Sequence, residues 1–215
     1  MKLAVIGKGK TGSSVIALAS SNHEVTVFDS KNQPTVAALQ KCEAAIVFVT
    51  PTILADIAPV LIDAKIPCVV GTTGFDFSKL HGLQAPWIVA SNFSKGMNLL
   101  FSIAKLVDNF QAQHPELNIA IREIHHTEKK DSPSGTALFL QKLFQRKPEI
   151  TALRKGDIKG VHGLELQLAG ERLELRHEAL DRNVFATGAI WAAENLLRNT
   201  PGIHQFENLL TKEKL

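Results

Sequence analysis

Near the N-terminus stands the pattern that most constrains the fold: an apolar run, a glycine-rich turn and a helix. Residues 2–6, KLAVI, form a short apolar run that stops at Gly7, as buried parallel strands do. The stretch GKGKTG at 7–12 fits G-x-G-x-x-G, and residues 13–20 continue with helical spacing. Such glycines allow a tight turn, a close approach of the backbone to a pyrophosphate, and close packing of helix on strand. A bare G-x-G-x-x-G is weak evidence, but a strand before it and a helix after it predict a dinucleotide-binding unit. The cofactor-binding residues expected here are Gly7, Lys8, Gly9, Lys10, Thr11 and Gly12.

An acidic residue ends the second expected strand. Residues 24–28 are followed by Asp29, roughly 20 residues after the first glycine, where an acid binds the adenosine ribose in such units. Asp29 would accept hydrogen bonds from the ribose hydroxyls and repel a 2′-phosphate, while Lys31 would offset part of that repulsion. We therefore expect NADH or NADPH as the cofactor, with a mild preference for NADH. The competing interpretation is an ordinary turn aspartate at a strand end.

Strand and helix patterns continue to alternate up to residue 94. Helices are predicted at 34–41 and 52–64, and buried strands at 44–49, 67–70 and 87–90. This alternation predicts an α/β fold with a Rossmann-like, doubly wound parallel sheet, in which ligands bind beyond the carboxyl ends of the strands. The residues at and just beyond the carboxyl ends of the last two strands are therefore expected to line the cofactor: Gly71, Thr72, Thr73, Ala90, Ser91, Asn92 and Phe93.

The pattern changes after Ser94. Residues 163–168 and 172–177 each alternate with period two around a short turn, which predicts an antiparallel hairpin with one apolar face. The leucines of that face would cover a helix expected at 96–113. The apolar stripe of this helix comprises Leu99, Ile103, Leu106, Val107 and Phe110. The solvated face of the hairpin would carry Arg172, Glu174 and Arg176.

These patterns divide the chain into two domains. We predict a dinucleotide-binding domain over 1–94 and a smaller α+β domain with a mixed sheet over 95–186. Two more helices are predicted near the C-terminus, at 187–197 and 203–210.

Composition narrows the classes of function. With 45% hydrophobic and 21% charged residues, the chain resembles an ordinary soluble protein. A net charge of +3 without a Lys/Arg-rich run argues against nucleic acid as a partner. No apolar stretch approaches the roughly 18 residues of a membrane span, and the run before Gly7 is too short for a signal peptide. Cys42 and Cys68 suggest no disulfide or metal framework, so we expect reduced thiols and a cytoplasmic location.

The densest chemistry lies in EIHHTEKKDSPSGTA, residues 123–137. A strand runs into it, a turn follows, and Ser134 would cap a helix, which leaves the amides of Gly135 and Thr136 free at a positive helix end. That end could cradle a carboxylate or phosphate, and two histidines and two lysines precede it. The competing interpretation, equally weighted on residue types alone, is an exposed basic loop before an ordinarily capped helix.

Other chemistries fit this segment less well. Adjacent residues at a strand end point to opposite faces, so His125 and His126 should not reach one metal ion, and we expect none. Ser134 lies in no G-x-S-x-G elbow and is not expected to be a nucleophile. One of the two histidines could be a plain core residue, and the isolated histidines elsewhere are assigned surface or packing roles.

Segment 123–137 resembles the signature of the dihydrodipicolinate reductases, E-x-H-H-x-x-K-x-D-x-P-S-G-T-A, with every fixed position filled. The GTTG stretch at 71–74 and the ASNFS stretch at 90–94 are similar to cofactor-lining segments of that family. The resemblance implies reduction of a small cyclic dicarboxylate in lysine and diaminopimelate biosynthesis. It also implies a homotetramer assembled through the second domain, with residues 187–215 packing back on the nucleotide domain.

The resemblance also assigns roles within segment 123–137. His125 and Lys129 match the catalytic, proton-handling residues of the family. The residues that match its substrate contacts are His126, Ser134, Gly135 and Thr136.

The chain departs from the family pattern in a few places. Lys10 and Thr11 stand where Arg-Met is usual, and Glu128 occupies a place that is often basic. Residue physics alone reaches only an NAD(P)-dependent reductase of an acid. Two alternatives therefore stay open: a dehydrogenase of another amino or keto acid, and a cofactor-binding sensor without turnover.

Overall fold

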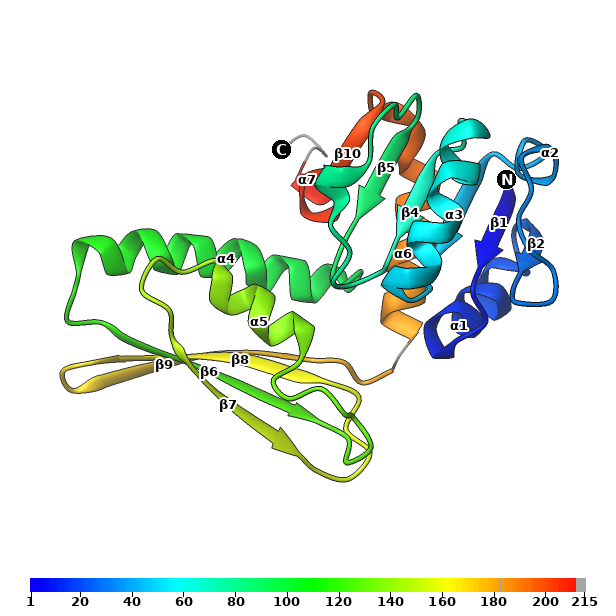
Figure 1. Cartoon of the computed structure of the whole chain (residues 1–215). Helices are drawn as coiled ribbons and strands as arrows, with labels where there is room; N and C mark the ends of the chain where they lie inside the picture. The colour runs from blue at the N-terminus through cyan, green and yellow to red at the C-terminus, as the bar shows by residue number, and fades with distance from the viewer. Residues whose placement is uncertain (182, 212–215) are drawn as a thin grey trace. The chain divides into compact units, whose positions relative to one another are not determined.

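The computed structural model of the chain describes residues 1–181 and 183–211 (Figure 1). The chain divides into two compact units, the first made of residues 1–93 and the segment from 183 onward, the second of residues 94–182. Each unit has its own sheet and its own hydrophobic core. Among the described residues, no helix is long and apolar enough to cross a membrane.

The first unit contains a six-stranded sheet in the order β10-β5-β4-β3-β1-β2, with every neighbouring pair parallel. Its strands are β1 (Lys2–Ile6), β2 (Glu24–Phe28), β3 (Ala44–Val47), β4 (Cys68–Val70), β5 (Pro86–Val89) and β10 (Gly202–Gln205). Its helices are α1 (Lys10–Ala19), α2 (Val36–Leu39), α3 (Pro51–Asp63), α6 (Asn183–Asn195) and α7 (Phe206–Thr211), with short 3₁₀ turns η1 (Phe77–Lys79) and η2 (Leu196–Arg198).

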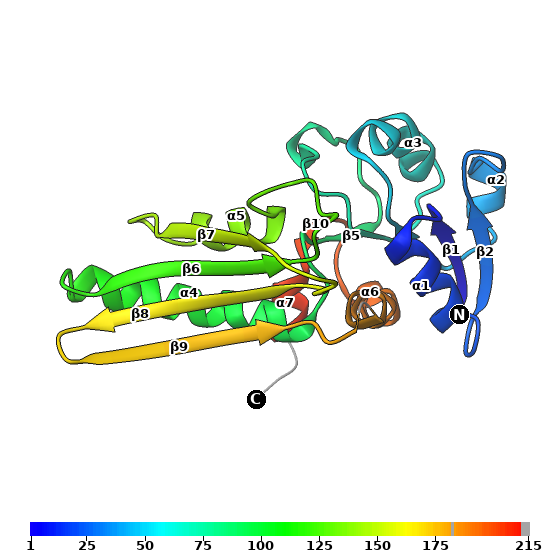
Figure 2. The same ribbon diagram turned by 90° about the horizontal axis from the view of Figure 1, so that it is seen from below.

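Helices cover both faces of this sheet (Figure 2). Along β1, Leu3 and Val5 belong to a core shared with α1, α6 and α7, whereas Ala4 and Ile6 belong to the core under α2 and α3. Because both faces are covered, the inner strands β1, β3, β4 and β5 are nearly continuous apolar runs, whereas the edge strand β2 alternates. The predicted doubly wound parallel sheet is confirmed.

The segment before the C-terminus differs from its prediction. The sequence predicted one helix over 203–210, but the structure has strand β10 followed by the short helix α7. β10 extends the sheet by pairing in parallel with β5. The run is too short for its apolar spacing to distinguish a strand from a helix, and its backbone partner lies on a distant segment that local patterns do not reveal.

The second unit is built on a four-stranded mixed sheet in the order β7-β6-β8-β9. Only the β6–β7 pair is parallel. The elements are α4 (Lys95–Gln113), β6 (Asn118–His125), α5 (Gly135–Lys142), β7 (Glu149–Arg154), β8 (Val161–Leu168) and β9 (Glu171–Glu178). Both helices lie on the same face of the sheet and share one core with it (Figure 1). The mixed sheet and the β8–β9 hairpin are confirmed, while β7 was not predicted.

Helix α4 buries a different face from the predicted stripe. Met97 and Phe101 are buried, whereas Leu106 and Phe110 of the stripe are 68% and 47% exposed. Leu173, expected on the covered face of the hairpin, is 55% exposed. Helix α4 is apolar on two faces, so spacing alone did not determine which face meets the sheet.

Gly188 of α6 lies so close to the backbone at Phe93 that a Cβ there would stand 1.8 Å from the Phe93 carbonyl oxygen. Gly188→Ala therefore has to push α6 away, and we expect a loss of roughly 1–3 kcal/mol in the free energy of unfolding. Chemical denaturation measures this loss. Gly135→Ala is the matched control, because a Cβ at the first residue of α5 meets nothing within 4 Å. Equal unfolding midpoints for Gly188→Ala and the wild type would contradict the close approach.

Candidate active site

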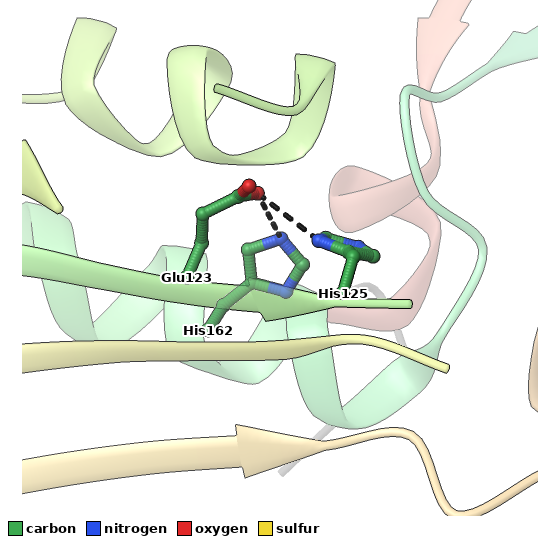
Figure 3. A group of neighbouring side chains, drawn as sticks. All are labelled: Glu123, His125 and His162. Atoms are coloured by element: carbon green, nitrogen blue, oxygen red, sulfur yellow. Dashed lines mark ion pairs between the residues drawn. The ribbon is translucent and has the colours of Figure 1, made fainter. Parts of the chain in front are cut away.

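The alternation of β6 turns Glu123 and His125 to the same face of the sheet, toward α5 (Figure 3). Glu123 is fully buried and His125 is 8% exposed. Arg122, the residue before Glu123, is exposed and pairs with Glu165 of β8 at 2.9 Å. His126 follows the end of the strand and is half-buried. An acid and an imidazole are thus carried by one rigid strand.

The loop after β6 ends at the N-cap of α5. The Ser134 hydroxyl oxygen accepts a hydrogen bond from the N–H of Ala137 at 3.2 Å, which confirms the predicted cap. The N–H of Ser134 donates to Oε2 of Glu123 at 3.2 Å. The start of α5 is thereby fixed to β6, with Gly135 exposed and Thr136 half-buried at its first turn.

The loop places one of its own carboxylates at this helix end. Nζ of Lys129 lies 2.8 Å from Oδ1 of Asp131. Burial alone would raise the pKa of Asp131, but the hydrogen bond and charge of Lys129, with the backbone N–H groups of Asp131 and Gly135, lower it. The N–H of Gly135, predicted to be free for an anion, is therefore near enough to the Asp131 carboxylate to lower its pKa. The arrangement shows that Lys129 and the α5 terminus can hold a carboxylate together.

Glu123 gathers donors from three segments. Arg154, at the end of β7, donates from Nη1 to Oε1 of Glu123, and from Nη2 to the carbonyl oxygen of Asp131. Nδ1 of His125 lies 3.2 Å from Oε2 (Figure 3). Burial would raise the pKa of Glu123, but contacts from His125, Ser134 and Arg154 outweigh it and lower the pKa to about 2. The carboxylate is therefore ionised at any physiological pH.

His162 of β8 is the residue that sequence reasoning missed. It lies opposite Glu123 in the antiparallel register and is 3% exposed. Its Nε2 stands 3.2 Å from Oγ of Ser134 and 3.8 Å from Oε2 of Glu123. Burial, and then the charge of His125, lower its pKa to about 3, so the ring is neutral. Only the cross-strand register brings His162 here, and no local pattern contains that register.

Arg154 was missed for the same reason, because it reaches Glu123 from a strand that was not predicted. Glu123, His125 and His162 have ligand atoms within 4.8 Å of one another, as in a metal site. However, the guanidinium of Arg154 and the N–H of Ser134 already occupy the Glu123 carboxylate. A divalent ion would have to share Glu123 with that cation, so the cluster fits a proton-holding network better.

In the first unit, the glycine turn has the space that a dinucleotide requires. Gly7 has φ +102°, and a Cβ there would lie 2.2 Å from the Phe48 carbonyl oxygen. A Cβ at Gly12 would lie 2.0 Å from the carbonyl oxygen of Gly7. Gly9, by contrast, has open space and is the N-cap of α1 without a side-chain hydrogen bond. The first amides of α1 are thus open to a pyrophosphate.

Asp29 forms a turn and pairs with a lysine of the glycine turn. Its Oδ1 accepts from the N–H groups of Lys31 at 2.9 Å and Asn32 at 3.1 Å. Its Oδ2 lies 3.4 Å from Nζ of Lys8. The pKa of Asp29 is lowered, first by the Lys31 and Asn32 amides and then by Lys8. The turn interpretation of Asp29 is therefore present in the structure.

The other expected cofactor residues follow β4 and β5. Thr72 is buried and donates its hydroxyl to the Val49 carbonyl oxygen at 3.0 Å. The ring of Phe93 is buried against Phe48 and Phe206, so only the backbone of Phe93 can line a ligand. Asn92 is buried as well. The less buried members of this set are Gly71, Thr73, Ala90 and Ser91.

Comparison with known families matches almost the whole chain. Residues 1–93 match the family described as "Dihydrodipicolinate reductase, N-terminus", and residues 96–210 match the one described as "Dihydrodipicolinate reductase, C-terminus". A 4-hydroxy-tetrahydrodipicolinate reductase of Xanthomonas campestris is 38% identical over 78% of this chain and 73% of its own. One from Bdellovibrio bacteriovorus is 35% identical over 80% of this chain and 77% of its own.

Among solved structures, a dipicolinate-bound dihydrodipicolinate reductase from Paenisporosarcina sp. TG-14 has a TM-score of 0.78 and 20% identity, covering 97% of this chain and 98% of its own. An aspartate dehydrogenase from Thermotoga maritima has a TM-score of 0.56 and 13% identity, covering 91% of this chain and 96% of its own. These likenesses show the fold.

Acid should destabilise the protein through His162. Its pKa of about 3 in the folded state lies below the ordinary 6.5, so its stabilising contribution is present above pH 6.5 and is lost as the pH falls toward 3. His162→Gln removes that contribution. The unfolding free energy of this variant, measured by urea titration between pH 7 and 4, should fall less than that of the wild type, by at least about 1.4 kcal/mol, the equivalent of one pKa unit. The exposed His81 provides the control, His81→Gln. An unchanged slope for His162→Gln would contradict a buried neutral ring.

Proposed function

The chain belongs to the dihydrodipicolinate reductase family, and on this premise we propose that it reduces 4-hydroxy-tetrahydrodipicolinate to tetrahydrodipicolinate. NADH or NADPH supplies the hydride, and the product serves lysine and diaminopimelate biosynthesis. The observation that carries the proposal is segment 123–137, which folds around the buried Glu123 and already holds a carboxylate between Lys129 and the α5 terminus. The glycine turn of the first unit supports the cofactor.

The substrate is a cyclic imine with two carboxylates, and the segment offers a place for each. One carboxylate binds the backbone N–H groups of Gly135 and Thr136, with Ser134 holding the helix end in position. The other binds His126 and Lys129. The present position of Asp131 indicates that the two places adjoin, because its single carboxylate pairs with Lys129 and has its pKa lowered by the Gly135 amide. Dipicolinate, a planar dicarboxylate bound by the solved relative, should take the same place.

His125 and Lys129 are the proposed catalytic residues. The 4-hydroxyl of the substrate leaves as water, with a proton from the neighbouring carbon, which creates a conjugated double bond. The hydride then brings an electron pair to one carbon of that bond, and the other carbon must receive a proton. His125, on the rigid end of β6, donates that proton. The ammonium of Lys129 stabilises negative charge that develops during transfer and anchors a carboxylate. Both residues lie in the second unit, and neither depends on a metal ion.

The cofactor is proposed to bind the first unit. Its pyrophosphate lies against the amides of the glycine turn, residues 7–12, and its nicotinamide end against residues 71–73 and 90–93. Lys10 and Thr11 open helix α1 there. The adenosine ribose is proposed to lie beside Asp29, whose carboxylate pairs with the ammonium of Lys8.

We also propose a homotetramer in the cytoplasm. The exposed Leu106, Phe110 and Leu173 border an apolar groove of about 570 Å³ in the second unit, which association with other copies would cover. Cys42 and Cys68 are free thiols, as in reducing compartments.

The test of the proposed function is nicotinamide oxidation followed at its absorbance maximum. The substrate is generated in place by condensing pyruvate with aspartate semialdehyde, and each precursor alone provides a control. We expect oxidation only with the condensation product. A folded protein that binds the nucleotide but oxidises none would favour the sensor alternative. Oxidation with another amino or keto acid alone would favour the dehydrogenase alternative.

Lys129→Ala should lower kcat by about 10²–10⁴-fold, the usual contribution of a proton-handling or charge-stabilising group. Nucleotide affinity should stay nearly unchanged, because Lys129 lies in the other unit. His125→Ala should behave similarly, whereas His126→Ala should mainly raise KM. The exposed neighbour Lys130 provides the matched control, Lys130→Ala, with wild-type kinetics. A Lys129→Ala protein of unchanged kcat would remove Lys129 from the mechanism.

Cofactor preference should follow the charges around Asp29. Lys8 pairs with Asp29 at 3.4 Å and offsets its repulsion of a 2′-phosphate, so the preference for NADH should be mild. Asp29→Ala should shift the ratio of dissociation constants toward NADPH, while Lys8→Ala and Lys31→Ala should shift it toward NADH. Each shift should be up to about fivefold, since exposed pairs are worth about 0–1 kcal/mol.

Fluorescence titration with each nucleotide measures these dissociation constants, and Lys41→Ala, exposed at the end of the α2 turn, is the control. If the wild type prefers NADPH and Asp29→Ala leaves the ratio unchanged, Asp29 is only a turn residue.

A further inference from the structure

We propose that Glu123, held by Arg154, is a positioning residue for this reduction: its carboxylate keeps the proton on Nδ1 of His125, so that Nε2 is the nitrogen that gives a proton to the substrate. This inference rests on the proposed role of His125. Neither Glu123 nor Arg154 is expected to touch the substrate, and each acts through a neighbour.

Glu123 is a buried carboxylate that is ionised. An ionised carboxylate accepts hydrogen bonds and donates none. Oε1 of Glu123 is taken by Arg154, and Oε2 receives the N–H of Ser134. Nδ1 of His125 stands 3.2 Å from the same Oε2. A proton on that nitrogen is attracted to the carboxylate, whereas a lone pair there would be repelled, so the carboxylate selects the Nδ1–H form.

Among the described residues, no other partner competes with Glu123 for Nδ1 of His125. Nδ1 of His125 is buried and has no hydrogen-bond partner of good geometry among the described residues. A small rotation of the imidazole toward Glu123 completes the bond. His162 does not compete for the proton, because its Nε2 lies 3.8 Å from Oε2 and also contacts the Ser134 hydroxyl at 3.2 Å. Its ring packs edge-on against His125, with centroids 5.1 Å apart, and limits rotation of that ring.

The other nitrogen of the His125 ring, Nε2, lies beside Gly160. A Cβ at position 160 would lie 3.1 Å from Nε2 of His125, so glycine keeps a side chain out of the space before that nitrogen. Nε2 is thus the ring nitrogen that lies beside a residue without a side chain, while Nδ1 faces the carboxylate. The two nitrogens are distinguished by their surroundings.

Arg154 holds the Glu123 carboxylate in place. Its side chain is largely buried beside a Glu123 side chain with no exposed surface. Its Nη2 also donates to the carbonyl oxygen of Asp131, and so ties the loop that carries Lys129 to the same carboxylate. Loss of the Glu123 charge should therefore disturb the His125 ring first, because Arg154 still holds the Asp131 carbonyl oxygen and with it the Lys129 loop.

The proton balance of the reaction is then simple. His125 begins as an imidazolium with a proton on each nitrogen, and the Nε2–H bond breaks as a bond forms to the substrate atom beside the hydride acceptor. The electron pair of the broken bond stays on Nε2. The other proton stays on Nδ1, where it faces Glu123. Solvent returns a proton to Nε2 before the next turnover.

Glu123→Gln tests the proposal, because it keeps the shape of the side chain but removes the charge. The imidazole nitrogens of the free, ¹⁵N-labelled protein are observed by NMR at pH 9, where imidazoles are neutral. His125→Gln assigns the His125 signals. We expect a wild-type His125 with its proton on Nδ1, and a shift toward the Nε2–H form in Glu123→Gln. kcat should fall about 10–100-fold, with KM changed less than about threefold.

Glu165→Gln is the matched control, since it removes a carboxylate that pairs with Arg122 on the same pair of strands. It should change neither the His125 signals nor kcat. If Glu123→Gln does not fold, the double variant Glu123→Gln/Arg154→Met removes both charges of the pair and leaves no buried cation unpaired.

An unchanged His125 tautomer in the variants would overturn the positioning role, and so would a kcat within twofold of the wild type. A purely structural role predicts lower stability without a tautomer change, and that outcome would overturn the proposal as well. Absence of turnover in the wild type would contradict the proposed function instead, and the NMR comparison in the free protein separates the two failures.

Discussion

A carboxylate with no exposed surface persists in a protein only when donors and opposite charge replace the water it has lost. Glu123 satisfies this requirement with Arg154 of β7, the N–H of Ser134 before α5, and His125 of its own strand. Because these partners come from separate segments, satisfying one carboxylate fixes a strand end, a helix start and the loop between them. The same burial keeps His162 neutral beside it. The geometry of the candidate site follows largely from this single constraint.

The site combines this fixed part with an exchangeable one. The Lys129–Asp131 pair lies nearer the surface, with the Asp131 side chain 56% exposed, and such pairs contribute little net stability. We therefore propose that a substrate carboxylate replaces Asp131 at Lys129 and at the α5 terminus at little cost. Glu123 cannot leave its place, because that would strand the buried guanidinium of Arg154. The proposed reduction of a dicarboxylate needs both properties, an exchangeable anion site and a fixed proton donor.

Local patterns predicted those parts of the structure that depend on neighbours in the sequence. The glycine turn at 7–12 and the Ser134 cap were found because short-range geometry demands particular residues there. Strand β10 was read as a helix because its partner β5 is distant in the sequence.

His162 and Arg154 were missed because only the cross-strand register places them at Glu123. The buried face of α4 was assigned wrongly, since that helix offers two apolar faces and only tertiary packing decides between them.

A crystal structure of the protein with dipicolinate bound would test most directly the division between a fixed and an exchangeable carboxylate. We expect that Nζ of Lys129, now 2.8 Å from Asp131, contacts a ligand carboxylate instead, and that the N–H groups of Gly135 and Thr136 bind the other end or the same group. The contacts of Glu123 with Ser134 and Arg154 should remain as they are. Dipicolinate bound away from segment 123–137, or bound while Asp131 stays on Lys129, would contradict an exchangeable carboxylate site.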